Sequence, residues 1–168
     1  MKYNIALVKQ WATDRGLHES TLQSQFCKGV EEGGEIFEAI LKQNKELFVD
    51  AIGDELVVLT ILCMIEGIDP DDYILQLPNP YDSVNFDEGV KKDECLKAGL
   101  YLGWAQGDLA RSICKGLPIS GDIKLIVEML NYICNICCVD IRECYRIAYK
   151  EISKRTGKTV DGVFVKDA

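Results

Sequence analysis

The sequence has neither the long apolar runs of a membrane-spanning protein nor the excess of basic residues that is typical of a nucleic-acid-binding protein. No run approaches the roughly 18 apolar residues of a membrane span, and Met1 to Asn4 lead into an amphipathic segment and not into a signal peptide. Acidic residues outnumber basic ones by 27 to 19, giving a net charge of −8. We therefore expect a cytoplasmic protein that binds neither nucleic acid nor membrane, and to which a polyphosphate would need metal ions to approach.

Histidine is almost absent, because His18 is the only one in the chain. The eight cysteines offer a single C-x2-C pair, Cys134 and Cys137, without a second pair at the spacing of a zinc module. All eight fall in or beside helical patterns, where a reduced cysteine behaves as a small buried hydrophobe. We interpret the cysteines as core residues and expect neither a disulfide framework nor a zinc site.

Helical periodicity covers most of the chain, and 48% of the residues are hydrophobic, which is enough for a substantial core. Gly16 and Gly67 are expected C-caps, and Ser20 or Thr21 is an expected N-cap. The sequence therefore predicts an all-α protein. The expected helices span residues 5–15, 21–43, 46–66, 69–77, 97–116, 122–138 and 140–153.

Two helical units are expected, joined by a stretch rich in proline, glycine, asparagine and aspartate. The segment GDLARSI of the second half can be laid over GEIFEAI of the first, so that Asp108 takes the place of Glu35. The second unit keeps the helical plan but lacks most of the acids, and chance similarity between amphipathic helices is the alternative to duplication. The boundaries are a first unit at 1–77, a linker at 78–92, a degenerate second unit at 93–153 and a basic tail at 154–168.

The strongest functional signal lies in residues 28–66, where two expected helices carry acids at helical spacing. Glu32 and Glu35 share one face of the first helix, and Asp50 lies one turn before Asp54 on the second. Two such carboxylates about 4 Å apart repel each other by roughly 4 kcal/mol at an effective dielectric near 20. A short turn favours antiparallel helices, which would let the four acids form an all-oxygen site for a hard divalent cation such as Mg²⁺.

A solvated acidic face is the competing interpretation of the glutamates. Helical glutamates commonly form i,i+4 ion pairs with lysines, and Lys28 and Lys42 are in reach. Asp54 favours the metal-site interpretation, because it starts an apolar stripe on which no lysine or arginine lies one turn away to pair with its charge.

The basic tail is the candidate for phosphate contact. Lys154, Arg155 and Lys158 stand close together near the end of an acidic chain. Basic residues at a helix C-terminus also favour the helix dipole, which is the alternative explanation for two of them. The apolar residues from Val160 to Val165 predict that this tail packs on the body or on another subunit.

The segment KGVEEGGEIFEAI followed by IGDELVVLTIL resembles the two-helix signature of the MazG-type all-α nucleoside triphosphate pyrophosphohydrolases, E-x-x-E, a spacer and E-x-x-D. The stretches WATDRGL and KEISKRTGKTVDGVFVK resemble in particular the MazG-like proteins of bacteriophages, and the tandem layout is similar to that of the dimeric dUTPases of the same superfamily. The similarity covers about residues 4–68 and 140–167.

The match can be made residue by residue. Glu32 and Glu35 take the E-x-x-E positions, and Asp54 takes the final position. Ala51 stands where the family usually has glutamate. Asp50 is the expected substitute, and the other acids considered for that place are Glu31, Glu38 and Glu55.

This resemblance implies a MazG-like bundle of two antiparallel units, working as a homodimer or higher homo-oligomer, in the host cytoplasm if the chain is phage-encoded. The implied reaction is Mg²⁺-dependent hydrolysis of a nucleoside or deoxynucleoside triphosphate to the monophosphate and pyrophosphate, in nucleotide-pool control, with Mn²⁺ as a substitute ion. A nucleotide-binding regulator without catalysis and a structural helical assembly protein are the alternatives.

The resemblance also implies roles for individual residues. Glu32 or Glu35 would accept a proton from the attacking water, and Trp11 or Phe26 would stack on the base, with core packing as the alternative for both aromatics. The implied metal ligands are Glu32, Glu35, Asp50 and Asp54. The implied substrate-binding residues are Trp11, Lys28, Lys154, Arg155 and Lys158.

Overall fold

The computed structural model describes residues 2–74, 92–160 and 162–167, and these residues are predominantly helical, which confirms the all-α prediction. A small antiparallel sheet of two strands, which the sequence analysis did not predict, follows the last helix. The elements are α1 (Lys2–Asp14), the 3-10 helix η1 (Leu17–Glu19), α2 (Leu22–Lys42), α3 (Lys45–Glu66), α4 (Asp71–Ile74), α5 (Lys92–Lys115), α6 (Ser120–Ile136), α7 (Ile141–Ile152), β1 (Gly157–Val160) and β2 (Val163–Lys166).

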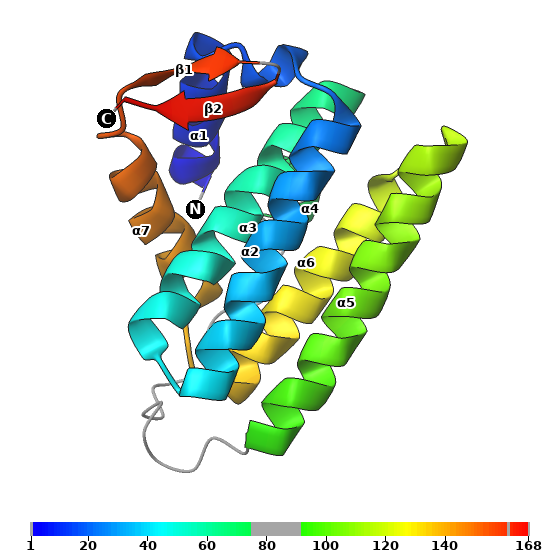
Figure 1. The fold of residues 1–168 in the computed structure, drawn as a ribbon, viewed down its shortest axis with the longest axis vertical. Coiled ribbons are helices and arrows are strands. Elements are labelled where there is room, and N and C mark those ends of the chain that lie inside the picture. Colours follow the sequence, from blue (N-terminus) through cyan, green and yellow to red (C-terminus); the bar gives the residue numbers. More distant parts are fainter. Residues whose placement is uncertain (1, 75–91, 161, 168) are drawn as a thin grey trace.

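Helices α2 and α3 form an antiparallel hairpin because their ends are fixed by adjacent caps (Figure 1). Thr21 accepts a hydrogen bond from the backbone N–H of Ser24 at the start of α2, and Asn44 does the same for Leu47 at the start of α3. Gln43, with a φ of 51°, ends α2 and leaves only two residues between the helices. The short connection places the acidic faces of the two helices opposite each other.

Helix α3 runs through the middle of the molecule, between α2 and α7 (Figure 1). From Ala51 to Cys63 every residue is buried except Asp54, which is partly exposed. A helix that is apolar on nearly all sides belongs in a core. The contact between α3 and α7 is close at Gly53, where an added Cβ would lie 2.5 Å from the carbonyl oxygen of Cys144.

A second antiparallel hairpin, made of α5 and α6, covers α2 on the side away from α7 (Figure 1). Gln106 of α5 donates through Nε2 to the backbone oxygen of Gly29 and to Oε1 of Glu55, both at 3.1 Å. Gly33 leaves room for this amide, since a Cβ there would lie 2.5 Å from Nε2. Glu55 is 2% exposed, and burial raises its pKa to about 8, so it carries a proton at neutral pH.

The two strands pack on the body at the junction of α1, η1 and α2 (Figure 1). Thr159 of β1 donates to the backbone oxygen of Arg15 at 2.5 Å, and Ser20 donates to the backbone oxygen of Gly162 at 2.7 Å. Phe164 of β2 lies against Trp11 of α1. The tail therefore contacts the chain's own body, one of the two arrangements expected from its apolar residues.

Several boundaries differ from the prediction. Helix α1 begins three residues earlier than expected and α5 five residues earlier. The expected linker at 78–92 and the end of the expected 69–77 helix fall outside the described residues, apart from Lys92, which begins α5. The α5–α6 hairpin repeats the helical plan of α2–α3, while the duplication itself stays a prediction. None of the described helices combines the length and apolarity needed to cross a membrane.

The cysteines are all free thiols. Cys63, Cys95, Cys134, Cys137 and Cys144 are buried, as the core interpretation predicted. That interpretation is wrong for two others, because their side chains lie on exposed positions of α2 and α5. These are Cys27 and Cys114.

Candidate functional site

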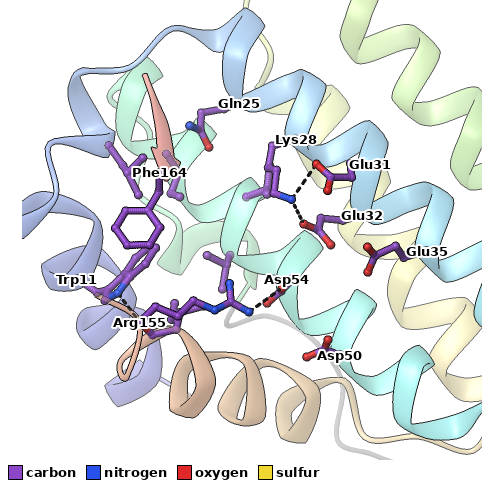
Figure 2. A pocket seen from close by; sticks show the side chains of 15 residues that line it. Trp11, Gln25, Lys28, Glu31, Glu32, Glu35, Asp50, Asp54, Arg155 and Phe164 are labelled. Carbon is purple, nitrogen blue, oxygen red and sulfur yellow. Dashed lines mark hydrogen bonds and ion pairs between the residues drawn. The ribbon is translucent and has the colours of Figure 1, made fainter. Parts of the chain in front are cut away.

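A cavity of about 280 Å³ lies where α1, η1, α2, α3, the end of α7 and strand β2 meet (Figure 2). Of the described residues, five carboxyl groups and two basic side chains line one end, and aliphatic and aromatic side chains line the other, with Gln25 as the single uncharged polar side chain. The charged residues are Lys28, Glu31, Glu32, Glu35, Asp50, Asp54 and Arg155, and the apolar ones are Trp11, Leu17, Val57, Val58, Ile61, Ile152 and Phe164.

All four acids expected from the sequence line this cavity. Glu32 and Glu35 reach it from α2, and Asp50 and Asp54 reach it from α3 (Figure 2). The antiparallel hairpin causes this convergence, since acids one turn apart on each helix then face the same space. Among the other acids considered for the place left by Ala51, Glu31 also lines the cavity.

Lys28 lies between the glutamates of α2. Its Nζ is 2.8 Å from a carboxylate oxygen of Glu31 and 2.8 Å from one of Glu32. The pair with Glu31 is exposed and fits the solvated-face interpretation, whereas the Glu32 side chain is only 5% exposed. Lys42 pairs with Glu38 outside the cavity, so that acid takes no part in the charged end.

Asp54 carries the clearest sign of uncompensated negative charge. Its Oδ2 lies 3.7 Å from the guanidinium of Arg155, while its Oδ1 is buried and has no hydrogen-bond partner among the described residues. Burial and the nearby charge of Glu32 raise the pKa of Asp54 to about 6, against the opposing effect of Arg155. Burial, and next the charge of Glu32, also raise the pKa of Glu35. This end of the cavity therefore attracts cations.

The chemistry of these donors suits a hard divalent cation, because carboxylate oxygens are the ligands that Mg²⁺ and Mn²⁺ prefer. The unpartnered Oδ1 of Asp54 is the atom best placed to gain from such an ion. Within the described ranges, however, no three His, Cys, Asp or Glu side chains are grouped so as to hold a metal ion. Lys28 and Arg155 stand among the carboxylates instead, so an ion would have to draw the acids together and displace these two cations.

The expected substrate-binding residues divide into two groups. Trp11, Lys28 and Arg155 line the cavity. Lys154 does not, and it pairs with Glu151 on the surface at 2.9 Å. Lys158 is exposed on β1 and does not line the cavity either.

Phe26 and Glu55 also lie away from the cavity. Phe26 packs against the core, which matches the core-packing alternative. Glu55, considered as a replacement for the missing acid, faces α5 and bonds to Gln106.

At the aromatic end, Trp11 was expected from the sequence to contact the base, whereas Phe164 beside it was not foreseen. The indole Nε1 of Trp11 donates to the backbone oxygen of Ile152 at 2.9 Å, and the Trp11 and Phe164 rings meet edge to face with centroids 5.7 Å apart. The guanidinium of Arg15 lies 4.8 Å from the Trp11 ring centroid and 5.4 Å from that of Phe164. Asp-Gly at positions 161 and 162, flanked by apolar residues, is a hairpin signal that could have predicted the strands.

Comparison with known proteins yields one partial match. Over 63 residues the chain is 44% identical to a Haemophilus phage HP1 protein described as an "Uncharacterized 18.2 kDa protein in rep-hol intergenic region". The matched segment spans 37% of this chain and 39% of the phage protein. No protein-family model matches the chain, and no solved structure matches it. The chain is thus similar, over part of its length, to a bacteriophage protein.

Proposed function

We propose that the protein hydrolyses a nucleoside or deoxynucleoside triphosphate to the monophosphate and pyrophosphate with the help of Mg²⁺ or Mn²⁺. The observation that carries the proposal is the two-ended cavity. Acids from α2 and α3 line one end together with Lys28 and Arg155, and the Trp11 and Phe164 rings line the other. A nucleotide has the matching layout, with an anionic chain at one end and a flat ring at the other. The resemblance to the E-x-x-E and E-x-x-D signature points to the same chemistry.

The metal ion would be held by Glu32, Glu35, Asp50 and Asp54. When bound, the ion would neutralise the negative charge of the phosphate oxygens and lower the pKa of a coordinated water molecule. Without an ion the same carboxylates are partly balanced by the protein's own cations. In this proposal a bound metal ion therefore takes the place of Lys28 and Arg155 beside the carboxylates.

Lys28 and Arg155 are the cations assigned to the phosphates. Both already face the cavity, and each would be released from its carboxylate, Glu32 or Asp54, when that acid turns to a metal ion. A lysine or arginine beside the β and γ phosphates stabilises the charge that develops on the leaving pyrophosphate.

Glu35 is the better candidate for the group that accepts the water proton. Glu32 is engaged by Lys28 at 2.8 Å, whereas no ion pair of Glu35 is observed among the described residues. The raised pKa of Glu35 increases its basicity toward a proton at neutral pH. The proton of the attacking water would pass to a carboxylate oxygen of this residue.

A coupled assay for released pyrophosphate tests the proposal. The purified protein is incubated with Mg²⁺ and a panel of canonical and modified nucleotides, and we expect turnover of at least one of them. Glu35→Gln and Asp54→Asn should each lower the rate by 100-fold or more, since general-base and metal-ligand losses have effects of about that order. Glu38→Gln on α2 and Glu46→Gln on α3 are matched controls outside the cavity and should keep the wild-type rate. No product from any nucleotide would refute the proposal.

Nucleotide binding without turnover is the second candidate function. It is favoured by Ala51, which is fully buried and leaves no acid at that place, and by the acids not being grouped for a metal in the described residues. Tight Mg²⁺-dependent binding of an intact triphosphate would support this candidate. Nucleotide-pool control and a homodimer or higher homo-oligomer are further parts of the proposal, and sedimentation of the purified protein tests the latter.

A further inference from the structure

Among the residues that the structure describes, Gln25 is the only uncharged polar side chain that lines the cavity, and it stands beside the apolar end. The residue is 4% exposed, so its amide is almost wholly inside the protein. A buried amide that lacks a partner for either of its two ends loses a substantial part of its hydration energy. What each end of this amide bonds to therefore indicates what the cavity is built to receive.

The amide nitrogen is fully used. Nε2 donates to the backbone oxygen of Gly162 at 3.0 Å and to Oγ of Ser20 at 3.4 Å. A backbone carbonyl can only accept, so the nitrogen must be the atom that faces Gly162. Rotating the amide by half a turn would place Oε1 against the carbonyl oxygen of Gly162 and lose that hydrogen bond. The hairpin turn thus fixes the orientation of the Gln25 amide.

The amide oxygen has a different environment. Within the described part of the chain no hydrogen bond to Oε1 of Gln25 is observed, and Oε1 is not among the buried atoms that lack a partner, so it faces the open cavity. Figure 2 shows the carboxamide at the cavity edge of α2, between Phe164 and Lys28. The cavity therefore presents one fixed hydrogen-bond acceptor next to its aromatic wall. The wall itself offers no donor, because the indole N–H of Trp11 is engaged by Ile152.

We infer that Gln25 reads the base of the bound nucleotide, by accepting a hydrogen bond from an N–H group on the edge of a ring that packs against Trp11 and Phe164. The inference rests on the nucleotide proposal above and adds a requirement on the substrate. The base must present an N–H donor at the position facing Oε1, and a keto oxygen or an unprotonated ring nitrogen there is rejected, since the fixed amide cannot turn to donate.

The size of the effect follows from general behaviour of buried polar groups. A site built to hydrogen-bond a ligand N–H discriminates strongly against an analogue that lacks it, because the bound analogue displaces water from the acceptor oxygen and offers no donor in return. We expect a 10- to 100-fold weaker binding of such an analogue. The loss should vanish when Gln25 itself is removed.

The test measures binding of nucleoside monophosphates in EDTA, so that neither metal nor hydrolysis enters. The four natural monophosphates are compared with analogues whose base lacks one N–H donor, such as purine in place of adenine and pyrimidin-2-one in place of cytosine or uracil. Trp11 fluorescence in a Trp104→Phe background, which leaves one tryptophan of the two, reports binding next to the indole. Calorimetry on the unmodified protein provides an independent affinity.

Three variants separate recognition from folding. Gln25→Met keeps the shape but removes the amide, and should bind a natural monophosphate and its donor-lacking analogue equally. Gln23→Met, an exposed position on the same helix, should keep the wild-type preference. Ser20→Ala removes one partner of Nε2 but leaves Oε1 and the bond to Gly162, and should also keep the preference.

The outcomes distinguish this inference from the proposed function. A base preference that disappears in Gln25→Met supports the inference even if no nucleotide is hydrolysed. The inference is overturned if no monophosphate binds at millimolar concentration, if donor-lacking analogues bind as tightly as natural bases, or if Gln25→Met keeps the wild-type preference. Hydrolysis of triphosphates with any of these results would leave the proposed function standing alone.

Discussion

Replacing Gly53 by alanine tests the packing that holds the site together. A Cβ at this position of α3 would lie 2.5 Å from the carbonyl oxygen of Cys144 and 2.7 Å from the Cβ of Ala148, both on α7. A backbone oxygen cannot rotate away as a side chain can, so the two helices must separate. Overpacking of this kind costs about 1–3 kcal/mol, and contacts this short belong at the upper end.

Helix propensity acts in the opposite direction, because alanine is favoured over glycine inside a helix by about 1 kcal/mol. We therefore expect Gly53→Ala to lower the free energy of unfolding by about 2 kcal/mol. Gly34→Ala on α2 is the matched control, since no atom lies within 4 Å of the added Cβ and the position is exposed. That variant should gain about 1 kcal/mol.

Urea denaturation followed by far-ultraviolet circular dichroism measures both variants against the wild type. The free energies of unfolding of the two variants should differ by about 3 kcal/mol, and this difference is insensitive to errors that both measurements share. Separation of α3 from α7 would also carry Arg155 away from Asp54, so Gly53→Ala should lose hydrolytic activity while Gly34→Ala keeps it. A Gly53→Ala protein as stable as the wild type would refute the packing that this reasoning assumes.

Three further perturbations test separate features. In EDTA, the free energy of unfolding should fall by on the order of 4 kcal/mol as the pH rises from 4.5 to 8, because the native state keeps a proton on Glu55 that the unfolded state releases. Glu55→Gln should flatten this dependence of stability on pH. The rise in melting temperature caused by Mg²⁺ should be large at pH 7.5 and small at pH 5, where Asp54 holds a proton; equal rises would contradict this. Phe164→Ala should lower the free energy of unfolding by about 1–2 kcal/mol in urea titrations, since the half-buried ring packs on Trp11, and an unchanged value would speak against that contact.

The helices and the convergence of the acids could be predicted because both depend on local information. Caps at Thr21, Asn44 and Gly67 act within one turn of the chain. Antiparallel pairing of α2 and α3 follows from a two-residue connection, and helical spacing then decides which acids face each other. The prediction of four acids at one site needed nothing beyond these rules.

The partners that the remote parts of the chain supply could not be predicted. Asp54 was expected to lack a cation because none lies one turn away, but Arg155 reaches it from beyond α7. The direction in which Glu55 faces could not be predicted either, because a helix that is apolar on nearly all sides has no hydrophobic periodicity that shows which face meets which neighbour. Gln25 had no signal of its own, since its role depends on the backbone oxygen of Gly162.

The basic tail shows where composition misleads. Its three cations suggested phosphate binding. Lys154 and Lys158 are exposed, however, and of the three only Arg155 lines the cavity. Besides Arg155, the tail contributes Phe164 to the cavity wall, from the short apolar run Val163 to Val165. An apolar run of three residues is a weaker sequence signal than a cluster of charge.

The most direct test of the central claim is to identify the products of a hydrolysed triphosphate by ³¹P nuclear magnetic resonance. With Mg²⁺ and the wild-type protein, we predict equal amounts of nucleoside monophosphate and pyrophosphate, and no products when EDTA is added or when Asp54→Asn replaces the wild type. Release of nucleoside diphosphate and inorganic phosphate, or the same products from the Asp54→Asn protein, would contradict the account.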